Sequence, residues 1–244
     1  MSSVGRFPDL VATWLFGARR TKFAERAVYI VLNFALILGL FYLLLNTVVY
    51  DWTGSLYRQG FHLNTALDNR IPFDPRWAII YLYVFYPLSA ATMAYFAFVE
   101  YRDGYALGLA LVLINLTADL VYIVFPVTTD IYRAALLAHP LTGNHLASVM
   151  YGYFKSDPSF NCFPSLHASV AVICFYAWYR LARRKHSRAL AIVAAGMGLV
   201  ALGVMVSTLF VKQHYIADEI AGLLLAWGAG AWAFGRHGAK AVEP

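Results

Sequence analysis

Six long apolar stretches constrain this chain more than any other feature. A helix needs about 20 mostly apolar residues to cross the hydrocarbon core of a bilayer. The stretches that approach or exceed this length are residues 28–49, 77–99, 105–125, 168–181, 189–210 and 215–234. Only 13% of the residues are charged, against roughly 25% in soluble domains. The sequence therefore predicts an all-α, polytopic membrane protein with six transmembrane helices in a single domain, residues 1–244.

The basic residues indicate how these helices are oriented. If the N-terminus is cytoplasmic, 13 of the 19 basic residues lie on the cytoplasmic side. The six on the opposite side are Arg58, Arg70, Arg76, Arg133, Lys155 and Lys212. Because Lys and Arg favour cytoplasmic loops, we expect cytoplasmic termini, a cytoplasmic segment at 1–27 and outer loops at 50–76 and 126–163. Basic flanks beside anionic lipid account for the +6 net charge, so we expect no nucleic-acid partner.

Both outer loops are longer than a simple connection requires. Within the first, residues 56–67 have amphipathic character, and Pro72 and Pro75 close the loop as an extended, rigid turn. The second loop carries several charged and histidine side chains among aromatic residues. We expect the two loops to be structured and to form a roof over the outer ends of the helices.

A histidine and an aspartate stand where the sixth apolar stretch begins. His214 and Asp218 are four residues apart, which places them on one face of a helix. The carboxylate can then accept the proton of one imidazole nitrogen and leave the other as a nucleophile or base. Ionisable residues at a membrane edge are costly and usually functional, although a lone histidine there is more often merely interfacial.

A second histidine, His167, opens the fourth apolar stretch directly after Pro164 and Ser165. Proline suits the first turn of a helix, and the N–H groups at that helix end, together with the Ser165 hydroxyl, form a natural anion site. His167 can give a proton to a leaving oxygen, and Lys212 adds a positive charge beside His214. This combination suits phosphoryl transfer through a covalent phosphohistidine.

Other functions use some of the same residues. His167 and His214 could be axial ligands of a haem or ligands of a metal, but Asp218 and the Pro-Ser turn would then have no role. A lipid transporter is compatible with six helices, although no internal repeat or broken midplane helix is evident. Ser165 as a hydrolase nucleophile is weaker, because no Gly-x-Ser-x-Gly turn surrounds it. We expect no metal, no cofactor and no disulfide between Cys162 and Cys174.

The motifs resemble those of the type 2 phosphatidic acid phosphatase superfamily of membrane lipid phosphatases and phosphotransferases. Its Pro-Ser-x-His motif matches Pro164, Ser165 and His167, and its Ser-Arg-x5-His-x3-Asp motif matches Ser207, His214 and Asp218. The resemblance implies that His214 is the nucleophile, that Asp218 orients it and that His167 is the general acid. It also implies six helices, a metal-independent reaction, and an active site that faces the extracytoplasmic side of the cell membrane.

The chain departs from the family pattern at two points. Thr208 stands where the third motif has arginine, and the first motif, Lys-x6-Arg-Pro, is absent in that form. Phosphate-binding cations must then come from elsewhere, and Lys212, Arg133 and Arg70 are the candidates, beside Ser165. Residues 68–73 and 212–215 are similar to the branch that includes inositol phosphorylceramide synthases. The expected substrate is a lipid phosphate or a phospholipid, with transfer of a phospho-headgroup between lipids as the alternative to hydrolysis.

Overall fold

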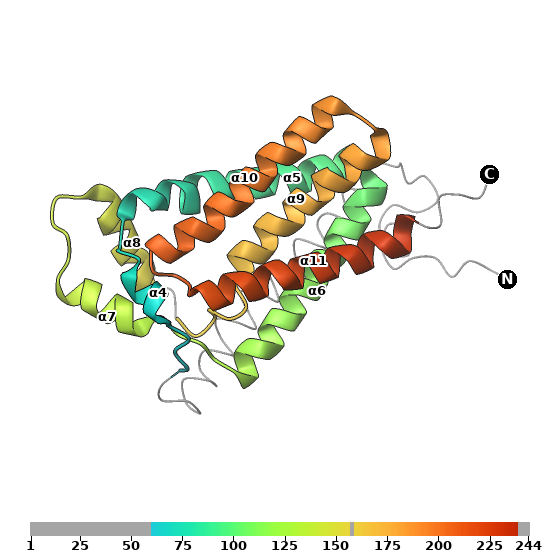
Figure 1. The fold of residues 1–244 in the computed structure, drawn as a ribbon. Coiled ribbons are helices and arrows are strands. Elements are labelled where there is room, and N and C mark those ends of the chain that lie inside the picture. The colour runs from blue at the N-terminus through green and yellow to red at the C-terminus, as the bar shows by residue number, and fades with distance from the viewer. Residues whose placement is uncertain (1–59, 157–158, 239–244) are drawn as a thin grey trace, which may run out of the picture.

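The long apolar stretches form long helices that pack side by side (Figure 1). The computed structural model describes residues 60–156 and 159–238, and the span predicted at 28–49 lies outside them. The first long segment combines the short helix η3 (Pro75–Trp77), the π-helix η4 (Ile79–Val84) and α5 (Phe85–Phe98). The other long helices of the described part are α6 (Tyr101–Val124), α9 (Leu166–Lys185), α10 (Arg188–Phe210) and α11 (Ile216–Gly238).

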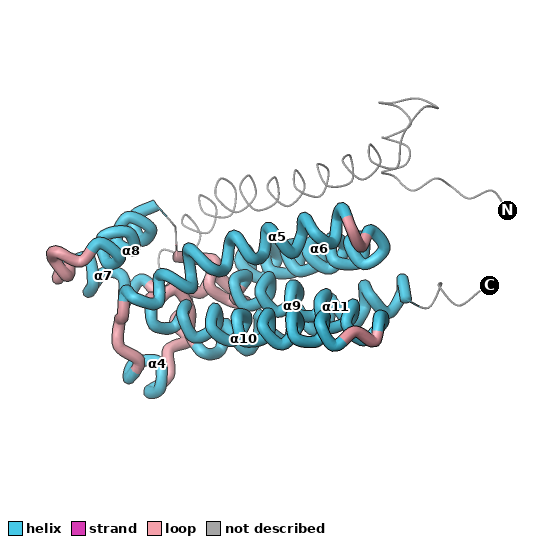
Figure 2. The backbone as a smooth tube through the Cα atoms, turned by 90° about the horizontal axis from the view of Figure 1, so that it is seen from above, coloured by secondary structure: helices cyan, strands magenta, loops and turns pink. Residues whose placement is uncertain are grey.

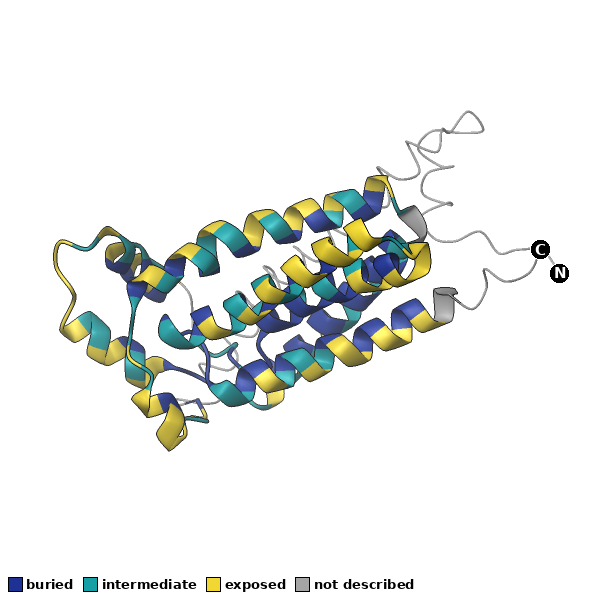
Figure 3. Cartoon of the chain, turned by 45° about the horizontal axis from the view of Figure 1, so that its top comes forward, coloured by how far each residue is buried: buried dark blue, intermediate teal, exposed yellow. Residues whose placement is uncertain are grey.

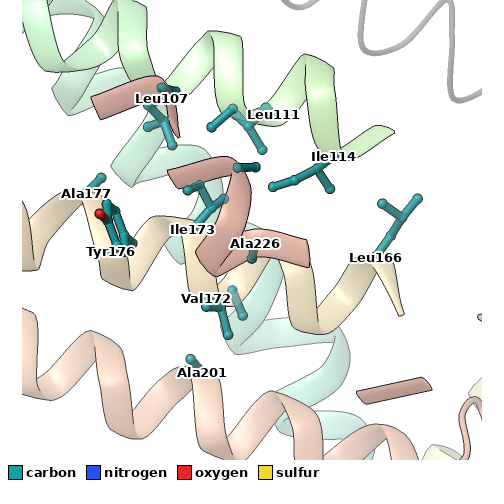
Figure 4. Close-up of a cluster of buried hydrophobic side chains, with 14 of the residues drawn as sticks. Leu107, Leu111, Ile114, Leu166, Val172, Ile173, Tyr176, Ala177, Ala201 and Ala226 are labelled. Carbon is teal, nitrogen blue, oxygen red and sulfur yellow. The ribbon is translucent and has the colours of Figure 1, made fainter. Parts of the chain in front are cut away.

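Helix α9 is the centre of the bundle, since it contacts α5, α6, α10 and α11. Seen from above, α5 and α6 lie together on one side, and α9, α10 and α11 lie on the other (Figure 2). The core between them contains aliphatic and aromatic side chains, among them Leu111 and Ile114 of α6 and Val172 and Ile173 of α9 (Figure 4). Burial of this apolar surface holds the helices together.

Among the described residues, three helical segments are long and apolar enough to cross a membrane: Pro75–Phe98, Asp103–Val124 and Arg188–Phe210. They correspond to three of the six predicted spans. The stretches predicted at 168–181 and 215–234 are also helical, as α9 and α11, and both helices carry charged residues in an end turn.

Figure 3 shows exposed positions along the outer faces of the long helices, and many of the exposed residues are large and apolar. Ile192 and Leu199 of α10 are 74% and 71% exposed, and Leu120 of α6 is 64% exposed. Apolar surface of this extent is typical of helices that face lipid. Together with the length of the helices, it suggests a membrane protein.

The two ends of the bundle differ in chemistry. At one end, the Arg184 guanidinium donates to Glu100 at 2.7 Å and to Asp103 at 2.9 Å, and Lys185 pairs with Glu100. The other end carries the short helices α4 (Ala66–Arg70), α7 (Asp130–Ala138) and α8 (His145–Ser156) (Figure 1). These helices belong to the two predicted outer loops, which are therefore structured in their described parts.

Backbone pairing joins the two loops. The Phe61 N–H donates to the Pro126 carbonyl at 2.8 Å, and the Thr128 N–H donates back to the Phe61 carbonyl at 2.9 Å. The Cys162 N–H bonds the Val127 carbonyl at 3.2 Å, so the segment before α9 adds to the same pairing. This pairing fixes Cys162 at the end of the bundle that carries α4, α7 and α8.

Helices α9 and α11 approach closely where α9 begins. A Cβ at Gly222 would lie 2.4 Å from the Ser165 carbonyl oxygen, so only glycine fits at this position. The Ser165 N–H donates to the Asp218 carbonyl at 3.0 Å, and the Ser169 hydroxyl lies 2.9 Å from the Gly222 carbonyl. The first turn of α9 is thus docked on the first turns of α11, and each of these turns carries a predicted site residue.

Candidate active site

The two predicted histidines meet at the end of the bundle that carries α4, α7 and α8 (Figure 1). His167 is in the first turn of α9, and His214 is in the link between α10 and α11. His167 Nδ1 lies 3.1 Å from His214 Nε2, although the residues are 47 positions apart. His214 is only 5% exposed.

The hydrogen bonds fix which nitrogen carries each proton. His214 Nδ1 lies 2.9 Å from the Cys162 carbonyl oxygen, which can only accept, so Nδ1 carries the proton. In a neutral imidazole Nε2 then has a lone pair, and His167 Nδ1 donates to it. His167 Nε2 becomes the acceptor for the Tyr86 hydroxyl, 3.3 Å away. The result is a chain of three hydrogen bonds in which Tyr86 donates to His167, His167 donates to His214, and His214 donates to the Cys162 carbonyl.

Asp218 lies on the Nδ1 side of His214, as the spacing predicts, but it is not the closest acceptor there. Its Oδ2 is 3.5 Å from His214 Nδ1 and accepts the Tyr215 N–H at 2.8 Å. The Cys162 carbonyl makes the shorter contact with Nδ1. The orientation of His214 therefore rests on a backbone carbonyl as well as on the predicted carboxylate.

Asp68 of the first outer loop holds the start of α11 in place. Its Oδ1 accepts the Ile216 N–H at 2.8 Å, and its Oδ2 accepts from Thr65 in a capping box. Asp68 is only 3% exposed. The carboxylate satisfies an N–H group at the start of α11 that has no partner within the helix, and so ties the loop to the helix that carries Asp218.

Ser165 is placed at the helix start as predicted, but its groups are used differently. It is the N-cap of α9, its hydroxyl oxygen accepts the Ala168 N–H at 3.2 Å, and its own N–H is taken by the Asp218 carbonyl. The prediction that the Ser165 N–H serves an anion is therefore wrong. The N–H groups of Leu166 and His167 are the donors at this helix end that precede the first intrahelical bond.

Arg133 is brought to the histidines by α7. It is 5% exposed, its Nη2 donates to Gln213 Oε1 at 2.8 Å, and its Nε donates to Thr129 at 3.1 Å. The guanidinium also lies over the Phe154 ring, 5.3 Å from the centroid. Because Gln213 directly precedes His214, the side chain of Arg133 is connected to the loop that carries His214.

Lys212 is buried, but its ammonium faces the first outer loop. Nζ donates to the carbonyls of Asp68 and Ile71 and lies 4.4 Å from the centre of the Tyr132 ring. Its backbone has a φ of 57°, which is uncommon for a side chain other than glycine. Through these contacts Lys212 fixes residues 212–216 against the α4 turn. Arg70, in the last turn of α4, is exposed.

Thr208, at the position of the missing arginine, is paired with a buried acid. Its hydroxyl lies 2.8 Å from Glu219 Oε1 and 2.7 Å from the Met205 carbonyl. Both residues are buried, with Thr208 at 0% and Glu219 at 3% exposure. A neutral hydroxyl and a carboxyl group therefore occupy the place where a guanidinium would be expected.

The electrostatic environment keeps His214 unprotonated. Burial, and to a smaller extent the positive charge of Arg133, lower the pKa of His214 to about 3, although the hydrogen bond to Cys162 opposes this shift. Burial also lowers the pKa of the Lys212 ammonium. At neutral pH the Nε2 lone pair of His214 is available, which a nucleophile requires.

Aromatic rings surround His167 on the side away from His214. The centroid of its ring is 4.8 Å from that of Tyr81, 5.5 Å from that of Phe85 and 6.3 Å from that of Tyr86. Tyr86 is itself 45% exposed on the outer face of the bundle. His167, the candidate general acid, thus contacts His214 and also packs against these three aromatic rings of η4 and α5.

Sequence reasoning missed several residues of this site. Tyr86, Gln213 and the Cys162 carbonyl all contact a histidine or its neighbouring loop, yet nothing marked them out among similar residues. One signal was available for Cys162, since it stands two residues before the Pro164-Ser165 motif. Within the described part of the chain, one group of three side chains has the spacing to hold a metal ion, namely Cys162, His214 and Asp218.

Comparison with known families matches this geometry to a superfamily. A family model described as the PAP2 superfamily matches residues 58–232, which include every residue of the site described above. The chain belongs to the PAP2 superfamily. Comparisons with curated proteins and with solved structures gave no significant match. Membership in the PAP2 superfamily suggests phosphatase or phosphotransferase activity, and it agrees with the resemblance seen in the histidine motifs.

Proposed function

We propose that this PAP2 superfamily member is a membrane lipid phosphate phosphatase or phosphotransferase that acts through a phosphohistidine on His214. The observation that carries the proposal is the contact between the two motif histidines. His214 directs an unprotonated Nε2 toward the Nδ1–H of His167, 3.1 Å away. A nucleophile and a proton donor are therefore already in reach of one another.

In the first step, the phosphate group of the substrate enters between the two rings and replaces their hydrogen bond. The Nε2 lone pair of His214 attacks phosphorus, and the bond from phosphorus to the ester oxygen breaks. For this step His167 must be an imidazolium, which takes up its second proton as the negatively charged phosphate binds beside it. It gives the Nδ1 proton to the leaving oxygen and becomes a neutral imidazole. In this proposal Arg133 and the N–H groups at the start of α9 stabilise the charge on the phosphoryl oxygens.

In the second step, His167 takes a proton from the acceptor hydroxyl, whose oxygen attacks the phosphorus, and the bond to His214 Nε2 breaks. Water as the acceptor gives hydrolysis, and a lipid hydroxyl gives transfer. The Cys162 carbonyl and Asp218 together stabilise the Nδ1–H of His214 when its ring carries positive charge in the phosphohistidine. No step in this scheme uses a metal ion.

Transfer of a phospho-headgroup between lipids is the alternative within the same chemistry. It is favoured by the two segments that resemble the inositol phosphorylceramide synthase branch, because these segments contact one another. Lys212 of the second segment donates to the Asp68 and Ile71 carbonyls of the first. A haem protein is disfavoured, because two histidine nitrogens in direct hydrogen-bond contact leave no space for an iron between them.

We further propose that the site faces the extracytoplasmic side. The end of the bundle opposite the histidines carries Arg184 and Lys185, together with neighbouring basic residues Arg180, Arg183 and Arg188. Basic clusters of this kind favour the cytoplasm.

The test is an assay of purified protein with a panel of lipid phosphates and phospholipids, with and without an acceptor lipid. Free phosphate identifies a phosphatase, and a new phosphorylated lipid identifies a transferase. Either activity should be lost in His214→Ala and should be inhibited by vanadate but not by EDTA. Turnover that survives in His214→Ala, or that needs an added divalent ion after EDTA, would overturn the proposal.

A further inference from the structure

Three chemically different metal ligands surround the ring of the proposed nucleophile. One ligand atom from each of Cys162, His214 and Asp218 lies within 4.8 Å of the other two. All three side chains are buried, with exposures of 1%, 5% and 0%. We propose that this trio is an inhibitory site for a thiophilic divalent cation such as Cd²⁺ or Zn²⁺.

The donor set matches this class of ion. Thiolate and imidazole are the ligands that zinc and other soft divalent ions prefer, and a carboxylate completes a common protein set. The geometry also indicates which nitrogen would bind. His214 Nδ1 faces Asp218 at 3.5 Å and the Cys162 carbonyl at 2.9 Å, whereas Nε2 faces His167.

One carboxylate oxygen of Asp218 is available to bind a cation. Its Oδ2 accepts the Tyr215 N–H, but its buried Oδ1 has no hydrogen-bond partner among the described residues. A buried carboxylate oxygen without a donor is energetically costly, and a bound cation would relieve that cost. The Cys162 Sγ lies 3.1 Å from the Ser159 carbonyl and 3.5 Å from the Gln213 carbonyl, and these weak thiol hydrogen bonds are given up when the thiolate binds a cation.

Occupancy of this site would remove the nucleophile. When the cation binds, Cys162 loses its thiol proton to solvent, because the thiolate is the ligand. The proton on His214 moves from Nδ1 to Nε2, because the metal takes the Nδ1 lone pair. His167 then carries its proton on Nε2, so that its Nδ1 accepts the hydrogen bond from His214. A neutral imidazole has one lone pair, so Nε2 can no longer attack phosphorus. The inhibition, unlike the binding, rests on the proposed role of His214.

The first experiment measures binding without reference to activity. Purified full-length protein is titrated with Cd²⁺, and the ultraviolet charge-transfer absorption of a cadmium thiolate is recorded. We expect this band in the wild type and in Cys174→Ser, which alters the buried cysteine of α9, and we expect it to be absent in Cys162→Ser. A band that persists in Cys162→Ser, or that disappears in Cys174→Ser, would overturn the site. Cadmium NMR of the wild type, expected to report one sulfur ligand, keeps the test independent of how the variants fold.

The second experiment measures inhibition, with the activity of each variant normalised to its own value without metal. Loss of a residue that supports a metal ligand costs roughly 10- to 100-fold in affinity, so loss of the thiolate itself should raise the half-inhibitory Cd²⁺ concentration at least about 10-fold. Cys174→Ser should respond like the wild type, and EDTA should restore activity. Equal sensitivity of Cys162→Ser and wild type would contradict the proposal. Cadmium bound at Cys162 without inhibition would leave the site standing but refute His214 as the nucleophile.

Discussion

Arg133 should be the most important of the three candidate cations for catalysis. Its side chain donates to Gln213, the neighbour of His214, at 2.8 Å, whereas the Lys212 ammonium bonds the carbonyls of Asp68 and Ile71. Arg133→Met keeps most of the aliphatic stem over the Phe154 ring and removes the guanidinium. A hydrogen bond to a charged group contributes about 1.5–3 kcal/mol. If Arg133 holds the phosphoryl oxygens, kcat/KM should fall roughly 10- to 150-fold.

The measurement is kcat/KM on the best lipid phosphate, with circular dichroism and thermal unfolding of each variant as the folding controls. Arg70→Met is the matched control, because Arg70 is exposed on α4, and it should behave like the wild type. Arg133→Lys should recover only part of the loss, since an ammonium keeps the charge but not the planar fork. If Arg133→Met were as active as the wild type, or if Arg70→Met showed the larger loss, the ranking of the cations would be wrong.

Three further predictions concern protonation, orientation and the partner carboxylate. The folded pKa of His214, about 3, is below its unfolded value of about 6.5. Below pH 6.5 the unfolded chain therefore binds a proton at His214 that the folded protein does not bind. The free energy of unfolding should decrease by up to about 1.4 kcal/mol per pH unit from this source as the pH falls toward 3. Thermal unfolding between pH 7 and 4 should show a smaller decline in His214→Gln, and identical slopes would refute the shift. Lys155→Cys should react with an impermeant maleimide from outside intact cells and His186→Cys should not, and the reverse pattern would invert the orientation. Asp218→Asn should lower kcat while a residual rate survives, because the Cys162 carbonyl still accepts the His214 Nδ1–H. Complete loss of activity in a folded variant would mean that Asp218, and not the Cys162 carbonyl, mainly orients His214.

The long helices and the closeness of His214 to Asp218 were predictable because they depend on local patterns. Long apolar runs predict long helices wherever the chain is placed, and three of them are confirmed as candidate spans. The spacing of His214 and Asp218 similarly predicts that the two side chains share one side of the structure. The predicted topology put His167 and His214 on the same side of the membrane, but no local rule predicts that residues at the ends of two different helices touch.

The cations show where sequence reasoning fails. Lys212 was a natural candidate because it is two residues from His214, yet its ammonium bonds the carbonyls of the α4 turn. Arg133 is far away in the sequence, and only the packing of α7 against the histidine loop brings it near. Side-chain direction in a link between helices is decided by tertiary contacts, such as the carbonyls of Asp68 and Ile71, that the sequence does not display.

The backbone of the site was equally hidden. The Cys162 carbonyl is the closest acceptor of the His214 Nδ1–H, but every residue has a carbonyl, so no residue type could mark it. The Ser165 N–H was expected to bind an anion and instead bonds the Asp218 carbonyl. That bond exists because Gly222 lets α11 come close to α9, a consequence of helix packing.

The central claim is that His214 carries the phosphoryl group, and trapping the intermediate tests it most directly. An aryl phosphate with a good leaving group needs little help from His167 in the first step, but the second step still needs His167 as a base. His167→Ala should therefore accumulate the phosphoenzyme, which mass spectrometry of the proteolysed protein can locate. The account predicts an acid-labile, alkali-stable phosphoryl group on the peptide that contains His214, and none in the His167→Ala, His214→Ala double variant. A phosphoryl group on Ser165, or one that persists in the double variant, would contradict the account.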